Sequence, residues 1–352
     1  MGSRVIGGQQ MQTQYGLSRR GFLCGVGTGA GALFGMPAVL RAQAPQVMKI
    51  GTSTINDVQH EWMRIYARAL EASSKRAIKV ELYPASQLGA APRMIEGTQF
   101  GTVQAFVGPP EFLSGVDNRY SVLGAPGLFR DMAHANSVLQ SAAVREAILG
   151  LGSNKGLRGV GLFMYGPASF NFRAPVNSLK EFEGKKIRVF ASAIQTEPLR
   201  KLNATAVPMA LSEVLPALQQ GTLDGVMSVL PVFTALRFYD AAKHILETDH
   251  AAVTVVSVVS KLWYDKLPKE LQAAVDDAGR QADREIYPWA VDALAKSRQA
   301  WTGNGGTLAR LSAEEQALLM KTLQPVGAEV TAKNAGEKAL FDLLVKAAAG
   351  PA

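Results

Sequence analysis

The apolar positions of the chain follow two periods, one typical of strands and one typical of helices. Residues 47–51 are typical of a first strand, and residues 78–83 alternate between apolar and polar side chains as a half-buried strand does. Between them, residues 59–73 carry apolar side chains at 62, 63, 66, 67 and 70, which is helical spacing. A helix at 93–100 and a strand at 102–107 complete a β-α-β-α-β order. This order predicts parallel strands with helices on the faces of the sheet.

A second cycle of strands and helices begins at residue 157. The expected strands are 157–165, 171–173, 184–190, 206–209 and 221–226, and the expected helices are 196–202 and 211–220. The first two of these strands flank a short loop. Two such cycles predict two lobes with a cleft between them. Loops at the C-terminal ends of the strands are the expected place for a ligand.

A single long helix is predicted over residues 268–302. Apolar side chains recur at 271, 275, 278, 282, 286, 289 and 293, in steps of three or four. Pro288 interrupts this pattern and should kink the helix. At 1.5 Å per residue the helix is about 50 Å long, which is more than one lobe needs, so we expect it to run across both. Residues 311–315 begin a further helix with a capping box.

The N-terminal 44 residues have the order of an export signal. Arg19 and Arg20 precede an uncharged stretch from 21 to 40, and Ala42-Gln43-Ala44 is a small-residue cleavage pattern. The adjacent arginines resemble the twin-arginine motif that directs folded proteins to export. The alternative is a membrane anchor, since the stretch is about long enough to span a bilayer. Its six glycines and Pro37 favour a cleaved signal peptide, residues 1–44, and a periplasmic mature protein.

Composition and charge exclude several classes of function. Hydrophobic residues make up 47% of the 352 residues and charged residues 19%, which is a globular composition. The formal charge is +8, but the first 44 residues hold four arginines and no acid; the remainder has 33 Lys and Arg against 29 Asp and Glu, or +4. This charge is spread out, so no nucleic-acid partner is expected. One cysteine and four unpaired histidines predict no metal site and no cofactor.

Several segments, in collinear order, resemble the solute-binding subunit of tripartite ATP-independent periplasmic (TRAP) transporters, the DctP-like family. They are 71–84 (EASSKRAIKVELYP), 87–89 (QLG), 94–102 (MIEGTQFGT), 182–189 (FEGKKIRV), 207–225 (VPMALSEVLPALQQGTLDG) and 263–268 (WYDKLP). The resemblance covers nearly the whole mature chain.

The resemblance implies a fold class and a function. The fold is α/β, a two-lobed periplasmic binding protein (type II-like) with hinge strands and a long kinked helix spanning both lobes. The first lobe would comprise 45–164 plus about 254–293, and the second 165–253 plus about 294–352. The function would be to bind an organic acid in the periplasm and deliver it to TRAP membrane permease subunits.

The resemblance also places the ligand carboxylate on Arg188, the arginine of the K-I-R strand. A planar guanidinium makes two parallel charge-assisted bonds to a carboxylate, which a lysine cannot reproduce. A second arginine that many members carry is replaced here by Ala168, and an acid and an amide after the second-lobe helix are replaced by Met227 and Ser228. We therefore expect a monocarboxylate with an apolar or modestly polar body. The expected ligand-binding residues are Arg188, Ser228, Met227, Leu211, Phe170, Ser53, Trp62 and Gly108.

Two alternatives remain open at this point. The first is a receptor of the same architecture that serves an ABC importer or a sensor kinase, although the long helix argues against most ABC receptors. The second is a periplasmic enzyme that uses the cleft. The sequence has no G-x-S-x-G elbow, no P-loop and no nucleophile–base pair that could be placed, so we expect no catalytic residue.

Overall fold

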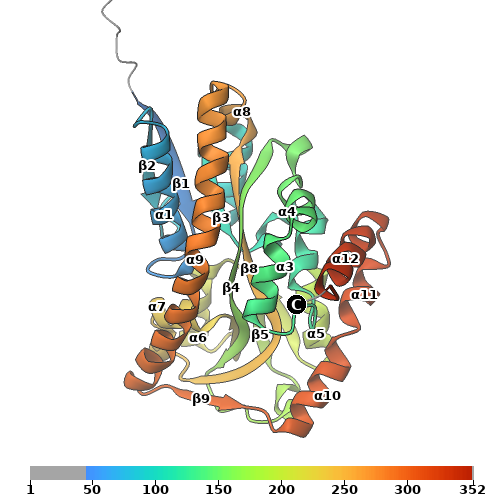
Figure 1. Cartoon of the computed structure of the whole chain (residues 1–352). Coiled ribbons are helices and arrows are strands. Elements are labelled where there is room, and N and C mark those ends of the chain that lie inside the picture. The colour runs from blue at the N-terminus through green and yellow to red at the C-terminus, as the bar shows by residue number, and fades with distance from the viewer. Residues whose placement is uncertain (1–44, 351–352) are drawn as a thin grey trace, which may run out of the picture. The chain divides into compact units, whose positions relative to one another are not determined.

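The computed structural model describes residues 45–350 (Figure 1). The expected signal peptide at 1–44 therefore lies outside the described residues. Within this part of the chain, no helix combines the length and the apolar character that crossing a membrane requires.

One mixed sheet of nine strands runs through the described residues, in the order β2-β1-β3-β8-β4-β7-β5-β6, with β9 paired to β8. The strands are β1 Gln46–Thr52, β2 Ile78–Tyr83, β3 Ala105–Gly108, β4 Leu157–Phe172, β5 Lys186–Val189, β6 Thr205–Pro208, β7 Gly225–Ser228, β8 His244–Ser260 and β9 Thr307–Arg310. The β1–β3 group pairs in parallel, and so do β5, β6 and β7. This confirms the two cycles of parallel strands that the sequence predicted.

The two parallel groups are joined by β4 and β8, which pair antiparallel with each other along most of their length. The predicted loop between strands 157–165 and 171–173 is wrong, because β4 is continuous through Gly166 and Pro167. Its register against β8 shifts between Met164 and Gly166 and again between Pro167 and Ser169. These irregularities accommodate a proline, which lacks an N–H to donate, without ending the strand.

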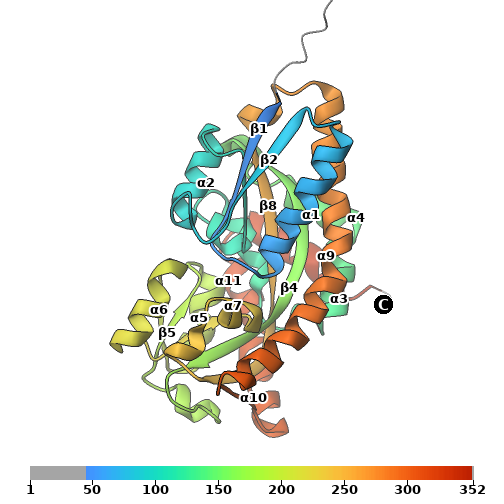
Figure 2. The ribbon, with the colours of Figure 1, turned by 90° about the vertical axis from the view of Figure 1, so that its left-hand side faces the viewer.

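The helices lie on both faces of the sheet (Figure 2). They are α1 Val58–Ser73, α2 Ala91–Phe100, α3 Met132–Gln140, α4 Ala142–Leu149, α5 Ala193–Lys201, α6 Leu211–Gln220, α7 Leu230–Ala235, α8 Lys261–Tyr264, α9 Lys269–Gly303, α10 Ala313–Leu323, α11 Val326–Thr331 and α12 Ala335–Ala348. Short 3-10 helices are η1 Pro110–Leu113, η2 Asn118–Gly124, η3 Ser153–Lys155, η4 Leu179–Phe182 and η5 Phe238–Asp240. The predicted cap of α10 is confirmed, since Ser312 accepts a hydrogen bond from the Glu315 N–H.

The long predicted helix is α9, which contacts α1 and β4 at one end and α7 and β9 at the other. It bends along its length and contains Pro288 (Figure 2). Its apolar stripe is buried at Val275, Ala278, Ala282 and Ile286, as the spacing predicted. Gly279 allows the close approach to β4, because a Cβ there would lie 2.0 Å from the Val160 carbonyl oxygen.

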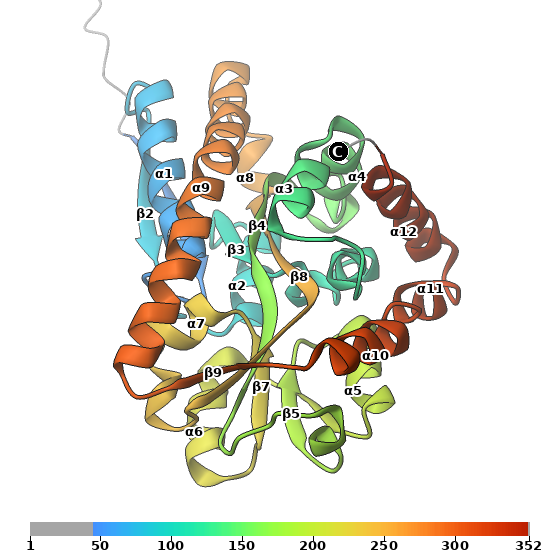
Figure 3. The same ribbon diagram turned by 60° about the horizontal axis from the view of Figure 1, so that its bottom comes forward.

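The last helix, α12, departs from the expected division into lobes. Residues 335–348 were assigned to the second lobe, but α12 packs on η2, α3 and α4, which belong to the 45–164 segment (Figure 3). The reason is an apolar face: Leu340 and Leu344 are buried in one cluster with Leu123 and Leu139.

Candidate functional site

Arg188 is the third of the four residues of β5, and its side chain is fully buried. Its Nε and Nη2 each donate to the carbonyl oxygen of Met209 at 3.2 Å, and Cζ lies 4.8 Å from the centroid of the Phe190 ring. Nη1 has no hydrogen-bond partner among residues 45–350. The Met209 carbonyl thus occupies one edge of the guanidinium, and the edge that carries Nη1 is free. Burial lowers the pKa of Arg188 to about 10, so the group remains charged at neutral pH.

A second buried ionisable residue, Glu111 in η1, interacts electrostatically with Arg188. Glu111 is 2% exposed, and its Oε1 accepts a hydrogen bond from Nε2 of Gln195 at 2.9 Å. Its Oε2 has no partner in the described part of the chain. Burial raises the pKa of Glu111 to about 7, although the Gln195 amide and the charge of Arg188 both act to lower it.

The Glu111–Gln195 pair occupies a space that a glycine leaves open. A Cβ on Gly124 would lie 2.3 Å from Oε1 of Glu111 and 2.5 Å from Nε2 of Gln195. The segment around Glu111 also meets the end of β5 directly: the Phe112 and Phe190 rings pack edge to face at 5.3 Å, and the Ser114 hydroxyl donates to the Ala191 carbonyl. Residues 111–114 therefore contact residues 190–195 from the opposite parallel group.

Two expected residues, Ser53 and Gly108, lie side by side at the ends of their strands. Thr52 of β1 pairs with Val107 of β3 in parallel, so Ser53, just after β1, and Gly108, the last residue of β3, lie at the same edge of the sheet. Ser53 is half-buried, and Gly108 is followed directly by Pro109 and η1. The chain from Gly108 leads to Glu111, a residue that no sequence motif had indicated.

Met227 and Phe170 do not lie with Arg188, contrary to expectation. Arg188 pairs with Val226, and Met227 pairs with Phe170, so the alternation of side chains along β7 places the two pairs on opposite faces of the sheet. Phe170 stacks on the His250 ring and packs against Phe182, in the same core cluster as Met227. Both residues are core rather than ligand surface.

Ser228 and Leu211 lie nearer to the arginine. Ser228 is one residue beyond Met227, so its side chain returns to the face of Val226 and Arg188, and it is 4% exposed. Leu211 is the first residue of α6, two residues after the Met209 carbonyl that binds Arg188, and it is half-buried.

Trp62 is also placed differently from the expectation. Its ring is fully buried and stacks on Tyr66 and Phe163 at 4.9 and 5.3 Å. Its Nε1 donates to Oδ1 of Asp283 in α9 at 2.7 Å. Trp62 lies on the inner face of α1, which packs on α9, and both its ring and its N–H are used there. It therefore belongs to the core rather than to a ligand surface.

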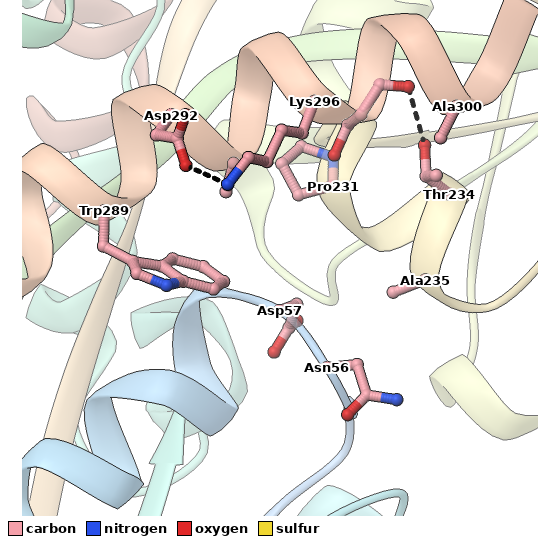
Figure 4. Close-up of a pocket in the computed structure, with 11 residues that line it drawn as sticks. Asn56, Asp57, Pro231, Thr234, Ala235, Trp289, Asp292, Lys296 and Ala300 are labelled. Atoms are coloured by element: carbon pink, nitrogen blue, oxygen red, sulfur yellow. Dashed lines mark hydrogen bonds and ion pairs between the residues drawn. The ribbon is translucent and has the colours of Figure 1, made fainter.

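A cavity of about 250 Å³ opens between the β1–α1 loop, α7 and α9 (Figure 4). Asn56 and Asp57 line it from one side, Pro231 and Thr234 from another, and Trp289 from α9. Asp57 caps α1 by accepting from the His60 N–H and also accepts from the Tyr165 hydroxyl; burial raises its pKa. None of the eight expected residues lines this cavity. Arg188 and Glu111 do not line this cavity either, and their unpartnered buried atoms define the candidate site.

No group of three His, Cys, Asp or Glu side chains within residues 45–350 is arranged to hold a metal ion. The candidate site thus consists of a buried guanidinium and a buried carboxyl group, each with one unpartnered atom, in a setting suited to an organic anion.

Comparison with known proteins gives a consistent result. The family model of bacterial extracellular solute-binding proteins, family 7, matches residues 51–334. The 2,3-diketo-L-gulonate-binding periplasmic protein YiaO of Escherichia coli is 29% identical over 241 residues, covering 68% of this chain and 73% of YiaO. The C4-dicarboxylate-binding periplasmic protein DctP of Rhodobacter capsulatus is 27% identical over 274 residues, covering 76% of this chain and 80% of DctP.

Solved structures share the fold. A TRAP periplasmic solute-binding protein from Bradyrhizobium, in complex with α/β-D-galacturonate, superposes with a TM-score of 0.80 at 25% identity, covering 86% of this chain and all of the other.

Proposed function

The chain belongs to the bacterial extracellular solute-binding proteins, family 7, and from this premise we propose that it binds a monocarboxylate on Arg188 and delivers it to a TRAP membrane permease. As a member of this family it is a periplasmic receptor for organic acids and not an enzyme. What is proposed is the class of acid, the residues that bind it and the permease as partner.

The free edge of the Arg188 guanidinium is the observation that carries the proposal. A buried cation without an anionic partner is costly, and native structures rarely leave one unpaired. Nη1 and the outer N–H of Nη2 form the end of the guanidinium that the Met209 carbonyl does not occupy. This end can donate two parallel bonds to one carboxylate. The Phe190 ring beneath the guanidinium holds its plane in place.

One carboxylate is favoured over two by the surrounding charges. Ala168 takes the position where many relatives carry a second arginine, and it is buried in the apolar core. The other charged group that acts on Arg188 is the acid Glu111. A second carboxylate on the ligand would therefore be buried beside a like charge, which costs several kcal/mol. The relatives are named for different acids, one for a C4-dicarboxylate and one for a diketo sugar acid. The number of carboxylates on the ligand therefore differs between members of the family.

The two lobes meet where β4 and β8 change register. We place the boundary in β4 near residue 165 and in β8 near residue 253, with α12 added to the first lobe. The register shifts between Met164 and Ser169 support this division, since an irregular ladder bends more easily than a regular one. Arg188 then belongs to the second lobe, and Ser53, Gly108 and Glu111 belong to the first.

A thermal-shift screen of the mature protein tests the proposal. The panel contains branched, aromatic and 2-oxo monoacids, sugar acids, and diacids such as succinate, each at one concentration far above an expected dissociation constant. Ligands that bind the native state raise the melting temperature. We expect the strongest shifts from monoacids, to be followed by calorimetry. Tight binding of a diacid without binding of any monoacid would overturn the proposed class.

A further inference from the structure

Arg188 is not alone in having an unpartnered buried atom. Oε2 of Glu111 is also buried without a hydrogen-bond partner among residues 45–350. Glu111 follows β3 of the first parallel group, and Arg188 lies in β5 of the second. Their charges nevertheless interact electrostatically. The Phe190 ring packs against both Phe112 and the Arg188 guanidinium, so the two segments are neighbours. Neither Nη1 of Arg188 nor Oε2 of Glu111 has a hydrogen-bond partner in the described part of the chain, so these two atoms are not bonded to each other.

The surroundings of Glu111 favour its ionised form, in which Oε2 acts as a hydrogen-bond acceptor. Gln195 donates to Oε1, and a donor at one oxygen favours the ionised carboxylate. The positive charge of Arg188 acts in the same direction. Burial opposes both effects, which makes an additional donor at Oε2 more valuable, because an ionised oxygen without one is poorly solvated. Gln195 and Gly124 both lie against Oε1, so Oε2 is the oxygen that is left for a donor from the ligand.

We propose that Glu111 determines specificity by accepting a hydrogen bond at Oε2 from a hydroxyl of the ligand whose carboxylate lies on Arg188. The inference rests on the proposed function, because it needs the carboxylate on Arg188. It adds that the ligand is a hydroxy acid, with the hydroxyl close to the carboxylate. A 2-oxo acid of the same skeleton presents only an acceptor to Oε2, and the unsubstituted acid presents nothing.

The preference follows from matching donor to acceptor. A site built to bind a hydroxyl rejects an analogue that lacks it, because its own buried polar group is then left unpaired. An oxo group facing an ionised carboxylate is worse still, since two acceptors approach each other. Glu111→Gln keeps the size of the side chain and offers an N–H₂ to the ligand. The variant can therefore donate to an oxo group at any pH, whereas the ionised carboxylate of Glu111, which predominates above pH 7, cannot.

Calorimetry on matched triplets tests the inference. Each triplet contains the 2-hydroxy, 2-oxo and unsubstituted acid of one skeleton, and the skeletons include straight, branched and aromatic chains. The full mature protein is titrated at a pH above 8, where Glu111 is ionised, as wild type, Glu111→Gln, Arg188→Ala and the control Glu96→Gln, which changes an exposed glutamate of α2. We expect the wild type to bind the hydroxy member at least about tenfold more tightly than the oxo member. In Glu111→Gln this ratio should fall by about tenfold or invert, and in Glu96→Gln it should not change.

The outcomes separate this inference from the proposed function. Loss of all binding in Arg188→Ala with an unchanged ratio in Glu111→Gln would retain the arginine and overturn the role of Glu111. Failure of every hydroxy acid to bind the wild type would also overturn it. Retained binding in Arg188→Ala would refute the proposed function itself. Melting curves of the free variants show whether each is folded before titration.

Discussion

Nε1 of Trp62 donates a hydrogen bond to Oδ1 of Asp283 at 2.7 Å, between residues separated by 221 positions in the chain. The other oxygen of Asp283 accepts from Nη1 of Arg145 at 2.7 Å and from the Leu162 N–H at 2.9 Å. One fully buried carboxylate therefore joins α1, α4, β4 and α9. These polar contacts join the long helix to the sheet, in addition to its buried apolar stripe.

Removing this carboxylate should destabilise the fold strongly. Asp283→Ala leaves the Arg145 charge and two N–H donors without their acceptor, and breaking a buried pair in this way costs about 3–5 kcal/mol. The control is Asp277→Ala on the exposed side of the same helix, whose surface ion pair with Arg280 contributes about 0–1 kcal/mol. Urea unfolding measures both. Equal stabilities of the two variants would contradict the central role of Asp283.

Arg188 should be essential for ligand affinity. Arg188→Ala removes the only cation assigned to the carboxylate and should weaken binding by at least about a hundredfold. Arg188→Lys keeps a charge but loses the two-bond geometry, and we expect a loss of at least about tenfold. Calorimetry with the best ligand from the screen gives both values. Arg200→Ala, which removes a largely exposed arginine of α5, serves as the control and should bind normally.

Glu111 should make stability depend on pH. Its pKa is about 7 in the native state and near 4.5 in the unfolded chain, so the native state holds more protons between these values. The free energy of unfolding should therefore fall as the pH rises from about 4.5 through 7. Glu111→Gln removes this loss, and its stability relative to the ligand-free wild type should rise by about 3 kcal/mol between pH 4.5 and 8. A constant difference between the two proteins across this range would show that Glu111 is not desolvated in solution.

Ligand binding should close the two lobes by a hinge motion. The contacts of residues 111–114 with residues 190–195 are present in this structure and would have to separate when the lobes open. Small-angle scattering should give a smaller radius of gyration with a saturating ligand than without it. An unchanged profile at saturation would argue against closure.

The expected export signal can be tested without structural information. Replacing both Arg19 and Arg20 by lysine should retain the precursor in the cytoplasm, because the twin-arginine route requires the pair. Cell fractionation followed by immunoblotting measures the distribution. A single Arg41→Lys change is the control. Normal periplasmic yield of the double variant, or a loss of export only when the general secretory route is blocked, would refute the twin-arginine interpretation.

Local patterns predicted the local elements well. The apolar spacing of α9 and the alternation in β2 depend only on nearby residues, and both elements lie where expected. The strand β8 was not predicted at all. Its residues 252–260 are buried on both faces, so apolar and polar side chains do not alternate along it. The continuity of β4 through Pro167 depends on its partner strand, which the sequence pattern does not reveal.

The candidate site could be predicted only in part, for a related reason. Arg188 stood in a recognisable strand motif, but the face on which Met227 and Phe170 lie is set by the pairing of β7 with β4. Glu111 had no motif of its own and becomes significant only when η1 lies against α5. An acid directly after the Gly108-Pro109-Pro110 strand end was the one available signal.

The pairing of β3 with β8 has a consequence for the order in which the protein can be assembled. Ala105 of β3 pairs with Val259 of β8. The strand that covers the β3 edge of the first parallel group is therefore encoded about 150 residues later in the chain than β3 itself. During synthesis this edge stays open until β8 has left the ribosome, although β1, β2 and β3 are made early. The nascent chain therefore needs protection against wrong pairing for most of its translation. The sheet of the first lobe is complete only after nearly three quarters of the chain has emerged, and α12 joins this lobe only at the end of synthesis.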